Sequence, residues 1–474
     1  MRRSDGRWTL GLAVVLVVVA LTTAAADGYV GWRTDGTGAY PDATPVTTWS
    51  GTENVLWKTP MSGASNSLPT IVGDRLFVCS EPATLLCVDK STGAIVWQAP
   101  NTAADIAPAE EVADLEAKTA EYNRLRGELG KVMREMRNVQ KQLQDNPDNA
   151  ELKAQMDQLR QQQQTLNAQI KPLAETWYVL PPTHGYTGFS SPTPISDGQH
   201  VWAVFGNGVA AAYDLEGNRV WARFVEKPPN DWGTSNTPVL ADGKLILHIG
   251  AMRALDPLTG EELWAQPGSA WAWGTSWVEE IAGVPVIFTS SGNAVRASDG
   301  EVLASKLGKL SWGSGPMVVD GVLYYIDNQG GESVSRAWRL PETADAPFAP
   351  ELLWQVEPRK DRYYGSPIIT DGLIYILTQV GVLTCLDAAT GATVYEQDLQ
   401  TGKPVFFGSL VLAGDNLMVT NEAGTTVIFA PGREYVEIAR NELGEMVRST
   451  PVFDGDRMYV RGYENLYCIG AAAG

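Results

Sequence analysis

A short phrase that recurs along the chain constrains the fold more than any other feature of this sequence. In it a small residue, an Asp, a Gly and a closing aromatic residue keep nearly fixed offsets. The phrase reads ALDPLTGEELW at 254–264, CVDKSTGAIVW at 87–97, AYDLEGNRVW at 212–221 and CLDAATGATVY at 385–395. A catalytic site is normally built once in a chain, so this recurrence predicts a repeated structural unit.

The phrase closes a longer unit of nearly constant length. Asp214, Asp256 and Asp299 lie 42 and 43 residues apart, and Asp387 follows after 88 residues, which is two units of 44. Within residues 237–264, apolar runs alternate with turn sequences such as ADG and PLTG. This alternation predicts four short antiparallel strands in each unit.

Each offset in the phrase has a mechanical explanation. The Asp can accept backbone N–H groups of the turn that follows, and the Gly can supply a positive φ there. The closing Trp offers an apolar face to a neighbouring unit. The alternative is that the Asp residues are metal ligands, but repetition at turn positions favours capping. The residues concerned are Asp89, Asp214, Asp256 and Asp387.

Eight such units can be counted, and the last lacks a fourth strand. The sequence NVLWKTP at 54–60 reads as that missing strand, with Trp57 in the closing aromatic position. Strands from both termini would then complete one unit and close a ring, which leaves no open edge. The predicted fold class is all-β, an eight-bladed β-propeller closed by an N-terminal strand. Its units lie near 69–97, 192–221, 237–264, 276–304, 316–354, 367–395, 410–437 and 451–469.

Residues 104–176, inserted after the first unit, follow a helical pattern instead. Apolar residues recur at steps of three or four, which predicts an antiparallel coiled-coil hairpin with Asp148 and Glu151 as a capping box. The expected pairs are Leu143 with Leu152, Met136 with Leu159, and Leu129 with Leu166, while Leu115 packs at the base, on the propeller or on Trp177. The hairpin is either an insertion lying along the propeller or an arm that meets a partner. In the second case Arg126, Met133 and Arg137 are candidate contacts.

The net charge limits the possible partners, and the N-terminus indicates an exported protein. The net charge is −19, which disfavours nucleic acid and anionic lipid as partners. Residues 1–26 resemble a signal peptide, with three Arg before an apolar run and small residues around Ala26, so 27–474 is the expected mature propeller. An uncleaved membrane anchor is the alternative. We therefore expect the protein in the periplasm or cell envelope.

The cysteines are predicted to be core residues. Cys87, Cys385 and Cys468 occupy the small-residue position of the repeat. A Cys79–Cys87 disulfide across one hairpin stays open at this point, because exported chains permit such bridges.

The repeat resembles that of eight-bladed, quinoprotein-type β-propellers. This group includes pyrroloquinoline quinone (PQQ) dehydrogenases and the BamB-type scaffold of outer-membrane protein assembly. The sequences GWRTDGTGAYPDA, NVLWKTPM and THGYTGFSSPTPISDG are similar to exported PQQ-like repeat proteins of bacterial envelopes. The resemblance covers roughly residues 30–100 and 180–474, and it implies a fold more strongly than an activity.

The search for reactive motifs is mostly negative. Phosphate-loop, zinc-protease, nucleophile-elbow and Cys-x-x-Cys patterns are absent from the sequence. His248 is predicted to be a core residue and His200 a surface residue. In the PQQ dehydrogenases that the chain resembles, calcium ligands, a catalytic Asp and often two adjacent Cys surround the cofactor, and no matching set can be placed here. We expect no cofactor, with PQQ and calcium as the alternative.

One set of residues could bind a ligand. An aromatic residue, usually followed by Gly and Ser or Thr, precedes most first strands, which predicts either packing between units or a ring of aromatic faces at one mouth of the channel. His184 is a candidate for ligand contact or for ordering its loop. The candidate residues are His184, Phe189, Asp231, Trp232, Asn236, Trp273, Trp312, Tyr364, Phe407 and Arg448.

These observations favour a non-catalytic binding protein of the bacterial envelope. It would contact a protein partner through the helical arm and one face of the propeller. A PQQ-dependent dehydrogenase and a carbohydrate- or small-ligand-binding module at the channel mouth are the alternatives.

Overall fold

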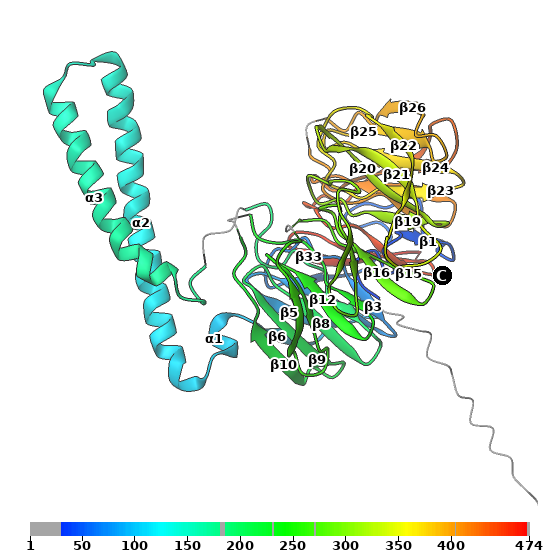
Figure 1. The fold of residues 1–474 in the computed structure, drawn as a ribbon, viewed down its shortest axis with the longest axis horizontal. Helices are drawn as coiled ribbons and strands as arrows, with labels where there is room; N and C mark the ends of the chain where they lie inside the picture. Colours follow the sequence, from blue (N-terminus) through cyan, green and yellow to red (C-terminus); the bar gives the residue numbers. More distant parts are fainter. Residues whose placement is uncertain (1–29, 181–184, 230–231, 270–271, 403, 472–474) are drawn as a thin grey trace, which may run out of the picture.

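The computed structural model describes residues 30–180, 185–229, 232–269, 272–402 and 404–471. These residues form 33 strands and three helices. The strands group into eight sheets, of which seven have four strands and one has five. Figure 1 shows the sheets gathered into one body, from which a pair of long helices extends.

The sheets in the first half of the chain contain the following strands. One holds β3 (Thr70–Val72), β4 (Arg75–Ser80), β5 (Thr84–Asp89) and β6 (Ile95–Pro100). The next holds β7 (Ile195–Ser196), β8 (His200–Val204), β9 (Val209–Asp214) and β10 (Arg219–Phe224). Then come β11 (Val239–Ala241), β12 (Lys244–His248), β13 (Met252–Leu255) and β14 (Glu262–Gln266). The fourth sheet holds β15 (Trp277–Ile281), β16 (Val284–Phe288), β17 (Ala294–Arg296) and β18 (Val302–Ala304).

The remaining sheets repeat the pattern, and two of them recruit strands from the N-terminus. The fifth holds β19 (Met317–Val319), β20 (Val322–Gly330), β21 (Ser333–Arg339) and β22 (Glu351–Val356). The sixth holds β23 (Ile368–Thr370), β24 (Leu373–Leu377), β25 (Val382–Asp387) and β26 (Thr393–Asp398). The seventh holds β27 (Val411–Ala413), β28 (Asn416–Thr420), β29 (Thr425–Ala430), β30 (Val436–Glu442) and β1 (Ala39–Tyr40). The eighth holds β31 (Val452–Asp454), β32 (Arg457–Arg461), β33 (Asn465–Ile469) and β2 (Val55–Pro60).

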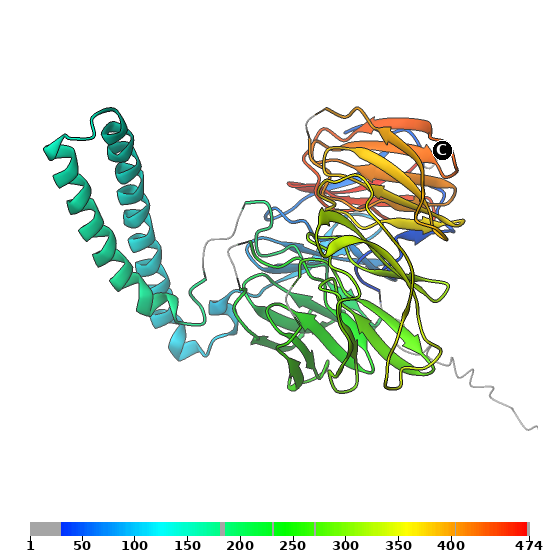
Figure 2. The same cartoon turned by 45° about the horizontal axis from the view of Figure 1, so that its top comes forward.

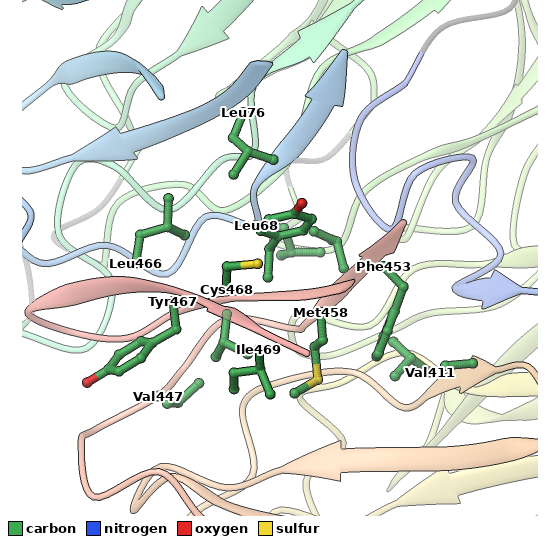
Figure 3. Close-up of a cluster of buried hydrophobic side chains, with 14 of the residues drawn as sticks. Leu68, Leu76, Val411, Val447, Phe453, Met458, Leu466, Tyr467, Cys468 and Ile469 are labelled. Carbon is green, nitrogen blue, oxygen red and sulfur yellow. The ribbon is translucent and has the colours of Figure 1, made fainter. Parts of the chain in front are cut away.

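The two ends of the chain meet in the eighth sheet. Strand β2 pairs antiparallel with β33, so that Trp57 lies opposite Cys468. One hydrophobic cluster continues from this sheet into the seventh and first sheets. Figure 3 shows its centre, where Met458 and Ile469 lie near Val411, and Leu68 and Leu76 approach from the first sheet. The closing strand predicted at 54–60 is therefore confirmed.

Tryptophans of the repeated phrase join neighbouring sheets. Each indole Nε1 donates a hydrogen bond to a backbone carbonyl of the next sheet's phrase. The pairs are Trp57–Lys90 at 3.1 Å, Trp97–Leu215 at 3.0 Å, Trp221–Pro257 at 2.8 Å, Trp264–Ala297 at 3.0 Å and Trp354–Ala388 at 2.9 Å. The Gly of that next phrase has a positive φ, and a Cβ on Gly260 would lie 2.7 Å from Trp221. The Gly thus allows both the turn and the close approach of the ring.

The Asp of the phrase caps its turn, as predicted. Oδ1 of Asp256 accepts hydrogen bonds from the backbone N–H groups of Leu258 and Thr259, at 2.9 and 2.8 Å. Asp89 does the same for the residues that follow it. Within the described ranges, no group of three His, Cys, Asp or Glu residues could hold a metal ion.

Hydroxyl side chains form a second set of links, on the inner side of the sheets. Just before its first strand, each sheet presents one equivalent residue, and in six sheets this is Ser or Thr. Its hydroxyl oxygen accepts a hydrogen bond from the backbone N–H of the equivalent residue in the preceding sheet. The N–H to oxygen pairs are Leu68–Thr193, Thr193–Thr237, Thr237–Thr275, Gly315–Ser366, Ser366–Ser409 and Ser409–Thr450, at 2.8 to 3.2 Å.

The segment from Val30 to Tyr40 crosses between sheets that are distant in sequence. Val30 pairs with Ser196 of the second sheet, and β1 runs parallel to β27 of the seventh. The fully buried Arg33 donates hydrogen bonds to the carbonyls of Pro367 and Leu410, at 2.9 and 2.8 Å. Burial lowers the pKa of Arg33 to about 10. The sequence did not reveal this segment, because no repeat position marks it.

The predicted core residues are found inside. All four cysteines are free and buried, so the alternative of a Cys79–Cys87 bridge is wrong. His248 is buried, with Nε2 at 3.2 Å from the carbonyl oxygen of Ser269, whereas His200 is partly covered and lies beside Asp197.

The insertion forms three helices, α1 (Ala103–Ile106), α2 (Ala109–Asp145) and α3 (Ala150–Ala174). By the rise of an α-helix, α2 is about 55 Å long. The predicted partners Met136, Leu143 and Leu152 pack against one cluster with Leu159. The predicted capping box is wrong. Asn149 is the N-cap, because its side chain accepts from the N–H groups of the two residues that begin at Glu151.

The contacts that fasten the hairpin lie at its base. Lys227 donates to the carbonyl of Ala174 at 2.6 Å, and the rings of Trp177 and Phe224 are 5.1 Å apart. Leu115 is buried there, as expected. Figures 1 and 2 show the rest of the hairpin extending away from the sheets.

No helix in the described part of the chain is long and apolar enough to span a membrane. The predicted signal peptide at 1–26 lies outside the described residues.

Replacing Trp264 by Ala should lower the free energy of unfolding by about 3 kcal/mol, because it removes ring packing between two sheets. Trp264→Phe should lower the free energy of unfolding by less, because the Phe ring keeps part of the packing but cannot donate the hydrogen bond to Ala297. Leu263→Ala is the matched control on the same strand, because Leu263 is 49% exposed. Urea titration followed by circular dichroism measures all three. An equal effect of Leu263→Ala and Trp264→Ala would contradict the docking role.

Glu445 supplies a pH-dependent link between the seventh and eighth sheets. Its carboxylate accepts hydrogen bonds from the backbone N–H groups of Glu464 and Asn465, at 2.6 and 2.8 Å, and from the Tyr467 hydroxyl. Burial alone would raise the pKa of Glu445, but the hydrogen bonds from Tyr467, Asn465 and the backbone together hold it below the ordinary value of 4.5.

A depressed carboxyl pKa stabilises the fold above the unfolded-state value, and this contribution is lost as the pH falls through the folded-state value. Glu445→Gln should therefore cost about 1–2 kcal/mol at neutral pH and progressively less below about pH 4. Urea titrations across this range measure the difference, with the exposed Glu434→Gln as control. A cost that does not change with pH would show that the carboxylate charge is not involved.

Candidate functional site

A single cavity lies where the segments before the first strands of all eight sheets converge. Its volume is about 520 Å³. Six residues that line it also take part in the hydroxyl links, namely Leu68, Thr193, Thr237, Thr275, Ser409 and Thr450. Trp32, from the N-terminal crossing segment, contributes to the wall. The cavity is thus built from the same residues that join the sheets.

Aromatic rings line much of this cavity in a continuous arc. Trp273 and Trp312 stack with ring centres 5.9 Å apart, and Tyr364 meets Trp312 edge-on at 5.5 Å. Phe407 stacks on Tyr364 at 5.0 Å, and Tyr186 follows at 5.7 Å. Each ring therefore packs on its neighbour and also borders the cavity. The two interpretations of the aromatic series, packing and a ring at the mouth, both describe this geometry.

Two arginines border the cavity beside these rings. Arg448 lies 4.8 Å from the ring centre of Tyr186 and 5.3 Å from that of Phe407, and it pairs with Glu422 at 2.6 Å. Its guanidinium also donates to the carbonyl oxygens of Gly185 and Tyr186. Arg362 lies 4.8 Å from the ring centre of Trp312. Cation–π contacts of this kind hold both guanidinium groups against the arc.

The structure gathers most of the predicted site residues but not all of them. The residues that line the cavity are Trp232, Trp273, Trp312, Tyr364, Phe407 and Arg448. Asn236 is buried instead, and its side-chain amide donates to the carbonyl of Gly274 at 2.6 Å. His184 and Asp231 lie outside the described residues.

Phe189 does not line this cavity, which corrects its predicted position. Glu81 accepts hydrogen bonds from the backbone N–H groups of Phe189 and Ser190, both at 2.7 Å. Phe189 instead lines a second cavity of about 420 Å³ at the base of the hairpin, with Leu115 and Trp177. Tyr186, three residues earlier, completes the arc in its place.

Sequence reasoning missed Tyr186, Trp32 and Arg362 as cavity residues. Arg362 could have been found, since it stands two residues before Tyr364 in the aromatic series. Trp32 and Tyr186 lie outside the repeats, so no periodicity marks them. Both residues reach the cavity through long-range contacts of irregular segments.

The described lining does not fit a calcium-supported quinone. Calcium prefers several oxygen ligands, and carboxylates are the usual protein donors. Among the described lining residues none carries a carboxylate. The cysteines lie in the sheets, with Cys79 and Cys87 in one buried cluster of the first two sheets. We therefore derive no reaction step through such a cofactor.

Comparison with solved structures supports the propeller architecture. BamB from Moraxella catarrhalis superposes with a TM-score of 0.54 at 12% identity, over 89% of this chain and 98% of that one. A quinohemoprotein alcohol dehydrogenase from Pseudomonas putida HK5 gives 0.51 at 10% identity, over 92% of this chain and 79% of that one. At such identities the likeness shows the fold, a β-propeller, and no activity.

Sequence comparison identifies the family. The chain is 23% identical over 309 residues to the outer membrane protein assembly factor BamB of Moranella endobia (strain PCIT), covering 58% of this chain and 73% of that protein. A family model described as outer membrane protein assembly factor BamB matches residues 19–122, 183–342, 321–434 and 349–474. Residues 123–182, most of the hairpin, fall between these matches. Because the matches span well over half of the chain, this protein belongs to the BamB family of PQQ-like β-propellers.

Proposed function

We propose that this protein is a non-catalytic binding scaffold of the bacterial cell envelope. In this proposal the eight sheets are the blades of one closed ring, and α2 with α3 is a coiled-coil arm that contacts a protein partner. The convergence of all eight sheets on one cavity supports the ring. The related protein from Moranella endobia is an outer membrane protein assembly factor, which supports an envelope location. Export through the signal-like segment 1–26 is part of the same proposal.

The observation that carries the partner-binding role is the independence of the outer half of the hairpin. Val132, Val139, Met156 and Leu159 form a hydrophobic cluster of their own. A separate cluster nearer the base includes Tyr122 and also takes in Val179, which follows the hairpin. Ordering a long helical pair costs conformational entropy, and closing the ring does not require this pair. Its helix faces are open to contact by a partner.

The outer half of the hairpin should be dispensable for folding and required for partner binding. Replacing residues 132–163 with a short Gly/Ser loop removes the outer cluster and leaves the base cluster in place. The thermal midpoint should stay within about 5 °C, because no contact between sheets is touched. Recovery of a cross-linked protein partner from envelope extract should be lost. Circular dichroism and pull-down with mass spectrometry measure the two outcomes.

Three results separate the possibilities. Unfolding of the shortened protein would show that the arm is structural. Full partner recovery by the shortened protein would contradict the arm as contact surface. If recovery survives shortening but is lost in Trp232→Ala or Trp312→Ala, the cavity mouth is the working surface instead.

A second candidate function rests on the aromatic cavity itself. Its rings, hydroxyl groups, the Asn66 and Gln379 amides and the two guanidinium groups are the side-chain types that bind sugars or small planar ligands. Sugars are bound by stacking on aromatic ring faces combined with directed hydrogen bonds, and the cavity presents both kinds of group.

Binding of such a ligand should change tryptophan fluorescence. Titration with soluble cello-, malto- and chito-oligosaccharides should give a saturable signal, and Trp312→Ala should weaken the affinity at least about tenfold by removing a stacking partner. Trp177→Phe, in the second cavity, is the control and should bind like the parent protein. The same affinity in Trp312→Ala would exclude the cavity as the site.

A further inference from the structure

We infer that the outward face of the outer half of α2 docks onto an acidic protein surface. The inference rests on the proposed function, because it names the chemistry of the partner that the arm would contact. Four cations form this face, called the basic face below. They are Lys131, Arg134, Arg137 and Lys141, and all four are exposed.

The four cations share one side of the helix. Their spacing of three, three and four residues keeps them within an arc of about 120°. Val132 and Val139, by contrast, are buried against α3. The basic face therefore points away from the seam of the hairpin. Glu135 is the one carboxylate between Lys131 and Lys141, so this stretch carries a net charge of +3 (four cations and one carboxylate).

The basic face differs from most other cations of the hairpin in forming no ion pair within the described residues. Elsewhere on the hairpin, Lys118 pairs with Asp114 at 2.6 Å and Arg124 with Glu121 at 2.7 Å. Arg124 also pairs with Glu128 at 2.6 Å, Lys153 pairs with Asp148 at 3.5 Å, and Arg160 pairs with Asp157 at 3.2 Å. Among the ion pairs of the described residues, none includes a residue of the basic face. Its charges are therefore available to an outside partner.

The length of the arm separates this charge from the acidic body. The whole chain carries a net charge of −19. The basic face begins about 33 Å and ends about 48 Å along α2 from Ala109. Charges in physiological salt are screened beyond about 8 Å, so the acidic sheets neither neutralise the basic face nor repel an acidic partner that reaches it. Charge complementarity then favours such a partner.

A protein surface fits this face better than a lipid surface. A helix that lies on a membrane inserts a wide apolar face beside its cations. Met133 is the exposed large hydrophobic residue on α2, at 39% exposure, and the seam is turned inward. An acidic polypeptide needs no apolar insertion, so its carboxylates can pair with the basic face directly.

The test compares two fourfold variants of the full chain. The first is Lys131→Gln with Arg134→Gln, Arg137→Gln and Lys141→Gln. The matched control is Lys118→Gln with Arg124→Gln, Lys153→Gln and Arg160→Gln, which removes the same charge from paired positions of the same hairpin. Gln is a good helix former, so both should keep the helicity seen by circular dichroism. The probe is fluorescently labelled poly-L-glutamate, followed by anisotropy at low and physiological salt.

We expect the parent protein and the control to bind the probe, more weakly at higher salt. The basic-face variant should lose about tenfold or more in affinity, since several exposed ion pairs are removed together. Equal loss in both variants would overturn the inference, because it would show only a dependence on net charge. Binding to phosphatidylglycerol vesicles without binding to the peptide, or self-association of the parent protein at low salt, would also overturn it.

Recovery of the envelope partner distinguishes a failure of this inference from a failure of the proposed function. If the shortened hairpin loses the partner and the basic-face variant loses it too, both stand. If the shortened hairpin loses the partner while the basic-face variant retains it, the arm binds its partner by other residues and only the inference fails. Retention by both variants would contradict both.

Discussion

The contact between neighbouring sheets is the constraint on which the rest of the structure depends. A four-stranded sheet cannot bury both of its faces alone, so each one is stable only between two others. Two kinds of link fix this packing, one at the outer strand and one near the cavity. Trp221 hydrogen bonds to Pro257 on the outer strand, and Thr237 accepts from Thr193 on the inner side. One or both links recur at every junction except that between the fourth and fifth sheets, and the terminal strands meet in the eighth sheet.

The cavity is a consequence of these links. Residues at equivalent positions before the first strands of the eight sheets come together, and they leave a space between them. The N-terminal segment fills part of that space, with Arg33 bonded to carbonyls of the sixth and seventh sheets and Trp32 at the wall. Much of what remains is lined by aromatic rings, which pack on one another from sheet to sheet.

The parts of the structure that could be predicted are those that the chain repeats. The period of the Asp and Trp positions predicts the sheets, and the seam of the insertion predicts its helices. The prediction of the α3 cap failed because two neighbouring residues, Asp148 and Asn149, are both suitable N-caps, and the structure uses Asn149. Phe189 left the predicted ring because Glu81 holds its backbone, a contact between residues 108 positions apart. No local pattern can reveal a contact of that range.

The arm and the cavity are joined by one stretch of chain. After α3, the backbone returns to the second sheet through Tyr186 and Thr187, which line the cavity, and Phe189, which lines the pocket at the base of the hairpin. The carbonyl oxygen of Tyr186 accepts two hydrogen bonds. One comes from the guanidinium of Arg448, just before β31, and the other from the side-chain amide of Asn66, just before β3. The return segment is therefore bonded to residues next to the first and the eighth sheets. The residues from Tyr186 to Phe189 therefore border both the cavity and the pocket at the base of the hairpin.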